Sequence, residues 1–259
     1  EHSLDIKLII GSEFLLKPDQ LEAQESIVVL AKNRQGYAQL CQLISLARQR
    51  CEKGRYQVDQ HDFEELSECL LIWNPHPNSI SELGKTLSTQ HKQRLWVGCH
   101  RRLSALDQSL NAHCQSMADH YDLPIVALGQ VIMHNPDRQM LHDTLTAIRL
   151  GMPVYACGYA LQANREHSLR PLHKIAKLYP PSWIQASVTI AQQCDFCLSE
   201  LSYQYPAELV PSGYDANSYL HYLVEQGKAI RFPAGVPHDI ALIIDKELSL
   251  IASEGYAHF

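Results

Sequence analysis

The alternation of short apolar runs with amphipathic stretches over residues 1–160 constrains this chain most, because it is typical of successive βα units. Such units favour a parallel sheet with right-handed crossovers, either open or closed into a barrel. We therefore predict an α/β fold. The predicted strands are Lys7–Ile10, Ser26–Ala31, Cys69–Trp73, Leu95–Cys99 and Pro124–Leu128.

Apolar residues at helical spacing predict helices between these strands. One helix is marked by Tyr37, Leu40, Cys41, Ile44 and Ala47, and another by Leu106, Leu110, His113, Cys114 and Met117. A third helix is expected to end at Gly151, and Pro153 prevents it from resuming.

Strand signals nearly vanish after about residue 165. The helices predicted there are Ser182–Cys194, opened by two prolines, Asn217–Ile230, and His238–Ser253 before Gly255. We expect an α/β domain in residues 1–164 and a helical segment in residues 165–259.

The composition limits the function classes. The formal net charge of −6 argues against a chain that serves as the main clamp on DNA, which needs clustered cations. No run approaches the roughly 18 apolar residues of a membrane span, and the start EHSLD does not resemble a signal peptide. We therefore expect no membrane partner and a cytoplasmic location.

Two local clusters have structural interpretations. The eight cysteines are scattered, so we expect reduced thiols, including those of the lone C-x-x-C at Cys194 and Cys197. A basic cluster is interpreted as a solvated helix end, with local nucleic-acid contact as the alternative. Its residues are Arg48, Arg50, Lys53 and Arg55, beside Tyr56.

A series of motifs resembles the bacterial C-family DNA polymerases, most closely the error-prone, damage-induced branch related to the polymerase III alpha subunit. The motifs are GSEF (11–14), NRQGYAQLCQLISLAR (33–48), KGRY (53–56), LHDTLTAIRLGMPVYACGY (141–159), LRPLHKIAKLYPPSWIQASVTIAQQCDF (169–196), YQYPAELVPSG (203–213) and ELSLIASEGYAHF (247–259). They occur in the family's order and near its spacing, so we interpret the chain as a fragment of such a polymerase.

The resemblance implies a PHP (polymerase and histidinol phosphatase) domain, which is a distorted (β/α)7 barrel. GSEF would lie on an early to middle strand, so that the first strands are missing or the barrel is open. The helical segment after residue 164 would connect the PHP domain to the polymerase palm.

PHP phosphoesterases bind two or three metal ions through His, Asp and Glu side chains at strand ends. The resemblance makes Glu13, His100 and His134 the candidate metal ligands. Gln130 and Ile132 depart from the family's G-D-V-H-M-H, and the chain has no H-x-H. Neither side chain replaces the lost anionic or imidazole ligand, so we expect a vestigial site, with a weak residual metal site as the alternative.

The resemblance places the magnesium-binding carboxylates of the polymerase beyond Phe259. Asp245 and Glu247 are the nearest pair, but residues two apart on a helix face different ways. The whole protein would use Mg²⁺, DNA and deoxynucleoside triphosphates, and would act in translesion synthesis and DNA repair with accessory proteins.

We therefore expect this chain to be a catalytically silent scaffold. Two other classes stay open. One is a metal-dependent phosphoesterase that uses Glu13, His100 and His134, and the other is a binding module that docks a partner through residues 165–259. Phosphate-binding loops (G-x-x-x-x-G-K-[ST]), nucleophile elbows (G-x-S-x-G) and H-E-x-x-H zinc motifs are absent from the sequence.

Overall fold

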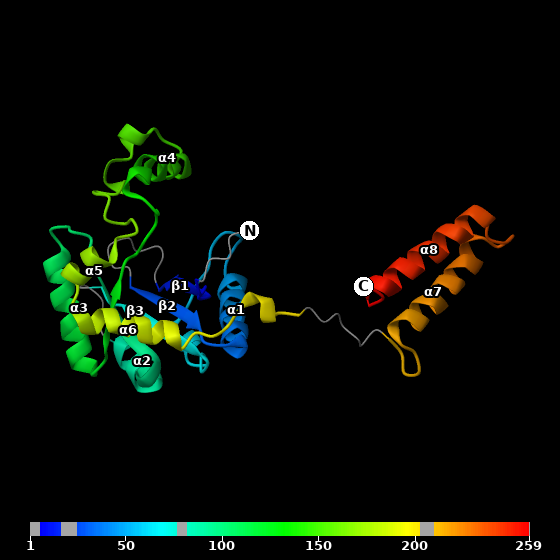
Figure 1. The fold of residues 1–259 in the computed structure, drawn as a ribbon, viewed down its shortest axis with the longest axis horizontal. Helices are drawn as coiled ribbons and strands as arrows, with labels where there is room; N and C mark the ends of the chain where they lie inside the picture. Colours follow the sequence, from blue (N-terminus) through cyan, green and yellow to red (C-terminus); the bar gives the residue numbers. More distant parts are fainter. Residues whose placement is uncertain (1–5, 17–24, 77–81, 203–209, 259) are drawn as a thin grey trace. The chain divides into compact units, whose positions relative to one another are not determined.

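The computed structural model describes residues 6–16, 25–76, 82–202 and 210–258 (Figure 1). Most of the motif at 203–213 therefore lies outside the described residues. The chain forms two compact units, Glu1–Glu200 and Leu201–Phe259, each of which is described by itself.

The first unit contains a five-stranded mixed sheet. Its strands are β1 (Gly11–Leu15), β2 (Ser26–Ala31), β3 (Cys69–Asn74), β4 (Leu95–His100) and β5 (Ile125–Leu128), and they lie side by side in chain order. The pairs β1–β2 and β2–β3 are antiparallel, whereas β3–β4 and β4–β5 are parallel. The predicted α/β class is confirmed, and the sheet is consistent with part of a PHP barrel.

Two details of the prediction were wrong. The first strand is Gly11–Leu15 and not Lys7–Ile10, because β1 pairs with β2 through the register Glu13 to Val28. Strand β2 also runs antiparallel to both of its neighbours, so the sheet is mixed and not parallel throughout. Residues 16–25 join β1 to β2 and are fewer than the dozen or so that a parallel crossover needs.

Among its described residues, the first unit has the α-helices α1 (Arg34–Gln49), α2 (Glu82–His91), α3 (Asp107–Tyr121), α4 (Gln139–Leu150), α5 (Leu172–Leu178) and α6 (Pro181–Gln192). Short 3-10 turns lie at Gln60–Phe63, Lys92–Arg94, Pro136–Arg138, Val154–Ala156, Gly158–Ala160 and Leu198–Glu200. The predicted helices around Leu40 and Cys114 are confirmed. Gly151 ends α4 with a φ of 66°, and Pro181 occupies the first turn of α6, both as predicted.

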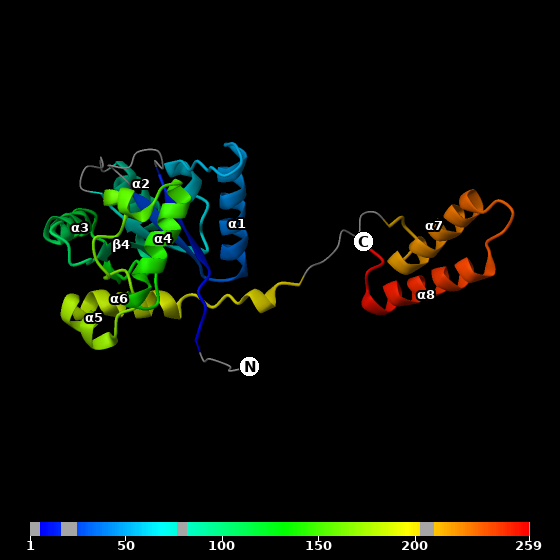
Figure 2. The same cartoon turned by 90° about the horizontal axis from the view of Figure 1, so that it is seen from above.

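Helices cover both faces of this sheet (Figures 1 and 2). On one face, α1, α2 and α3 pack on a core that includes Leu71, Trp73 and Val97. On the other face, Ile190 and Cys194, from α6 and the turn that follows it, pack against a smaller cluster. Its strand members are Leu70, Ile72, Trp96 and Val126. Residues that alternate along β3 thus serve both cores, which explains its continuous apolar run.

The motif NRQGY forms a helix start, as its turn residues indicate. The side chain of Asn33 accepts a hydrogen bond from the backbone N–H of Gly36 at 3.0 Å and caps α1. Glycine is required at position 36, since a β-carbon there would lie 2.1 Å from the carbonyl oxygen of Glu68.

The second unit is a pair of helices, α7 (Ala216–Arg231) and α8 (His238–Glu254). Asp215 caps α7 through the N–H of Ser218 at 2.9 Å, and Gly255 ends α8 with a φ of 71°. Both helices agree with the predicted ones. Large apolar side chains stay exposed on the pair, among them Leu223, Ile230, Leu242, Ile243 and Leu250.

The division between the units differs from the domain boundary expected at residues 164 and 165. Contacts divide the chain between Glu200 and Leu201, because α6 covers one face of the sheet and so belongs to the first unit. The boundary at residue 164 stays a prediction about the domains of the longer polypeptide.

Candidate functional site at the strand ends

One edge of the sheet collects polar side chains. The parallel strands β3, β4 and β5 end there with Asn74, His100 and Leu128. Antiparallel pairing brings the first residue of β2, Ser26, opposite Asn74, and the last residue of β1, Leu15, opposite Ser26. Of the three predicted metal ligands, Glu13 lies near the end of β1 and His100 is the last residue of β4.

Glu13 belongs to a hydrogen-bond chain that crosses the first three strands. The amide of Asn74 donates to the Ser26 hydroxyl at 2.9 Å, and this hydroxyl donates to Glu13 Oε1 at 2.7 Å. Asn74 is buried, and its Oδ1 has no hydrogen-bond partner among the described residues. A carboxylate oxygen of Glu13 is therefore already used within the sheet.

His100 is a neutral imidazole at neutral pH. Burial lowers the pKa of His100 to about 4, and the positive charge of Arg102 acts in the same direction. Asp107 opposes this shift but does not reverse it. Within the described part of the chain, the buried Nδ1 of His100 has no hydrogen-bond partner.

Arg102 follows β4 by two residues and enters the same cluster. Its guanidinium Nη2 donates to Oε1 of Gln130, the residue that stands where the family commonly has Asp. Asp107 and Glu13 both favour the charged form of Arg102, although burial lowers its pKa. Arg102 therefore interacts electrostatically with Glu13 and His100, the two predicted ligands at this edge.

The segment after β5 brings in His167. The carbonyl oxygen of Gln130 lies 2.9 Å from His167 Nδ1, and the backbone N–H of Ile132 donates to the His167 carbonyl at 2.9 Å. His134, the third predicted ligand, is an exposed residue beyond this contact. Ile132 is exposed as well and offers no ligand atom.

Three residues that hold this edge together were not predicted from the sequence. The buried Tyr179 hydroxyl donates to the carbonyl of Leu128 and accepts from the N–H of Arg101, both at 2.8 Å. Arg170 donates to the Arg101 carbonyl at 2.6 Å and forms an ion pair with Glu166 at 3.1 Å. Arg102 is the third. Arg170 and Tyr179 lie within the motif at 169–196, which is the signal that could have indicated them.

The donor set at this edge does not fit the multinuclear metal site of the PHP phosphoesterases. No group of three or more His, Cys, Asp or Glu side chains lies close enough to hold a metal ion in the ranges that the structure describes. The amide of Gln130 is bound to a guanidinium, and Glu13 is bound to a hydroxyl. The predicted ligand roles of Glu13, His100 and His134 stay predictions.

The basic cluster at the end of α1 has structural contacts. Arg50 forms a bidentate ion pair with Asp62, at 2.5 and 2.7 Å. The Tyr56 hydroxyl accepts a hydrogen bond from the N–H of Leu15 at 3.0 Å, and its ring packs edge-on against Phe14. These contacts account for Arg50 and Tyr56 without a nucleic acid.

All eight cysteines are free thiols.

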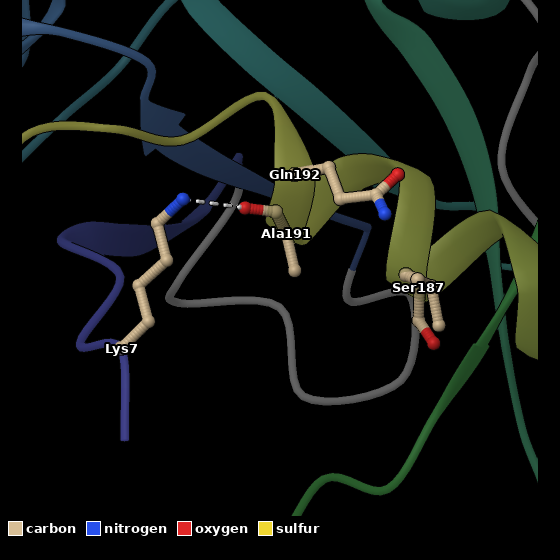
Figure 3. Close-up of a pocket in the computed structure, with 5 residues that line it drawn as sticks. Lys7, Ser187, Ala191 and Gln192 are labelled. Atoms are coloured by element: carbon tan, nitrogen blue, oxygen red, sulfur yellow. Dashed lines mark hydrogen bonds between the residues drawn. The ribbon is translucent and has the colours of Figure 1, made fainter. Parts of the chain in front are cut away.

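A hollow lies on the face of the sheet that α6 covers, between the N-terminal segment and α6 (Figure 3). Lys7 donates to the carbonyl of Ala191 at 3.2 Å and forms an ion pair with Asp195 at 2.8 Å. The hollow is lined by Lys7, Ser187, Val188, Ala191 and Gln192. Lys7 is engaged in the contacts above, and the Ser187 hydroxyl donates to the carbonyl of Ile184 at 2.7 Å. None of the described helices is both long and apolar enough to cross a bilayer.

The mixed sheet with helices on both faces is consistent with part of a PHP barrel, and the PHP domain family matches residues 1–112. Over all of its length the chain is similar to error-prone DNA polymerases. It is 46% identical to that of Vibrio vulnificus, and 42% identical to those of Saccharophagus degradans and Methylococcus capsulatus over 99% of the chain. The chain covers 24–25% of these relatives. The resemblance inferred from the motifs is confirmed.

Proposed function

We propose that this chain is a non-catalytic scaffold within an error-prone DNA polymerase, comprising a degenerate PHP domain and helices that connect it to the catalytic part. The observation that carries the proposal is the 46% identity over the whole chain to a quarter of such a polymerase. The longer protein would extend primers on DNA with deoxynucleoside triphosphates and Mg²⁺. We place it in the cytoplasm, in translesion synthesis and repair with accessory proteins.

The exposed apolar residues of α7 and α8 support a scaffold role. Ile230 is 80% exposed, and Leu242 and Ile243 are each more than half exposed. Apolar surface of this kind is usually covered by another protein surface. Because the relatives are about four times as long as this chain, we propose that further parts of the same polypeptide cover it.

Two assays of the purified chain test the proposal. Primer extension with Mg²⁺ and all four deoxynucleoside triphosphates should stay at background. Hydrolysis of p-nitrophenyl phosphate with Mn²⁺ or Zn²⁺ should also stay at background. Nucleotide incorporation would refute the non-catalytic assignment, and phosphate release lost in His100→Ala would favour the phosphoesterase.

A further inference from the structure

One residue of the strand-end cluster, by which we mean Glu13, His100, Arg102, Asp107, Gln130 and His167, is a cation. Arg102 lies in the loop between β4 and α3, and several contacts fix its backbone. Its N–H donates to Asp107 Oδ1 at 3.2 Å, and its carbonyl accepts from the Asn164 amide at 2.7 Å. The backbone of Arg102 is thus held by the nearby Asp107 and by Asn164, which lies 62 residues further along the chain.

The guanidinium binds the residue that departs from the family pattern. Gln130 presents Oε1 to Nη2 of Arg102 and uses its backbone carbonyl for His167. Gln130 also has a φ of 43°, a conformation that costs energy for a non-glycine residue and indicates that its surroundings hold it there. A neutral amide can accept this hydrogen bond without needing a metal ion to balance a charge.

The charges around Arg102 are those that a cation requires. The negative charges of Asp107 and Glu13 both favour the charged form of the guanidinium. A divalent ion placed among these groups would meet a fixed positive charge at low effective dielectric, which is strongly unfavourable.

We propose that Arg102 is the resident cation of the strand-end cluster, and that this cluster binds no divalent metal ion because the guanidinium, which donates to Gln130, already supplies a positive charge among the candidate ligands. The proposal goes beyond the scaffold assignment. It concerns what holds the domain together, and it does not depend on the activity of the longer protein.

Metal binding by the purified chain is the first test. Equilibrium dialysis against Mn²⁺ and Zn²⁺, followed by elemental analysis, should find far less than one ion per chain. The melting temperature should be the same with and without EDTA. One or more ions bound per chain, lost in His100→Ala, would overturn the proposal.

The second test replaces the cation. Arg102→Met keeps most of the side-chain length but removes the charge and the donors, so it should lower the melting temperature by several degrees. Arg102→Lys should recover part of that loss. The matched control is Arg165→Met, which removes an exposed ion pair with Asp137 and should leave the melting temperature unchanged.

The third test asks whether the cluster binds a metal ion once the guanidinium is removed and a carboxylate is added. The double variant Arg102→Met with Gln130→Asp removes the guanidinium and restores a carboxylate at residue 130, so it should bind Mn²⁺ at least tenfold more tightly than the wild type. If Arg102→Met melts like Arg165→Met, Arg102 is not the resident cation. If Arg102→Met fails to fold, the dialysis result with the wild-type chain still decides whether the cluster binds metal.

Discussion

Gly98 faces the side chain of Asn74 between neighbouring parallel strands, and a β-carbon at residue 98 would lie 2.0 Å from Asn74 Oδ1. The same β-carbon would lie 2.6 Å from Leu128 Cδ1 and 3.0 Å from Ile72 Cγ2. The missing side chain of Gly98 therefore makes the room in which Asn74 reaches Ser26 and links β3 to β2.

Gly98→Ala should destabilise the first unit by about 1–3 kcal/mol, the usual cost of adding a methyl group to a filled interior. Asn74→Ala in the same chain should recover only part of this loss, because Leu128 and Ile72 still obstruct the methyl group. Urea unfolding of the two single variants and the double variant measures the coupling.

The control for this experiment is Gly227→Ala in α7, where a β-carbon meets nothing within 4 Å. That change should stabilise the helix by roughly 0.5–1 kcal/mol. A Gly98→Ala variant as stable as the wild type would contradict the packing described here.

Tyr179→Phe should lower the free energy of unfolding by about 1–3 kcal/mol. The change leaves the Leu128 carbonyl and the Arg101 N–H without the hydroxyl that now satisfies both. Tyr159→Phe removes a hydroxyl from a fully exposed ring and should change nothing. Equal midpoints for the two variants in urea would show that the Tyr179 hydroxyl is not a structural link.

The stability of the first unit should fall as the pH drops below about 6.5. Burial, followed by the charge of Arg94, lowers the pKa of His91 in the folded chain, so the unfolded chain takes up its proton first. Protonation would also remove the hydrogen bond that His91 Nδ1 accepts from Arg94 Nη2 at 3.0 Å. The contribution of His91 is therefore present above pH 6.5 and is lost progressively below it.

Urea unfolding between pH 7.5 and 5 checks this expectation. His91→Gln should reduce the dependence of stability on pH without abolishing it, because burial also lowers the pKa of His100, His113 and His167. His173→Gln removes an exposed ring from α5 and is the matched control. A wild-type chain equally stable at pH 7.5 and 5 would contradict the burial of these rings.

Most helices and four of the five strands could be predicted from the sequence, because each depends on local periodicity and on end signals such as Gly151 and Gly255. The first strand could not. The stretch at 6–10 is mostly apolar, as expected of a strand. Ile6 and Leu8 are nevertheless exposed, because the sheet pairs through Gly11–Leu15. Pairing register depends on a distant strand and leaves no local mark.

The candidate site was only partly predictable. The motifs indicated Glu13 and His100 near one edge, and the replacement of Asp by Gln at residue 130 suggested the loss of a ligand. They could not indicate Arg102, because its contacts come from Asp107, Gln130 and Asn164. Those residues meet only when three connections fold over the same edge of the sheet.

The scaffold role is tested most directly by a chimera. The quarter of the Vibrio vulnificus error-prone DNA polymerase that matches this chain is replaced by residues 1–259, and primer extension is compared with that of the intact enzyme and of a version lacking the quarter. We predict that the chimera extends primers within about tenfold of the intact enzyme, a difference of roughly 1.4 kcal/mol, while the truncated version does not. A folded chimera as inactive as the truncated version, or a truncated version as active as the intact enzyme, would contradict the account.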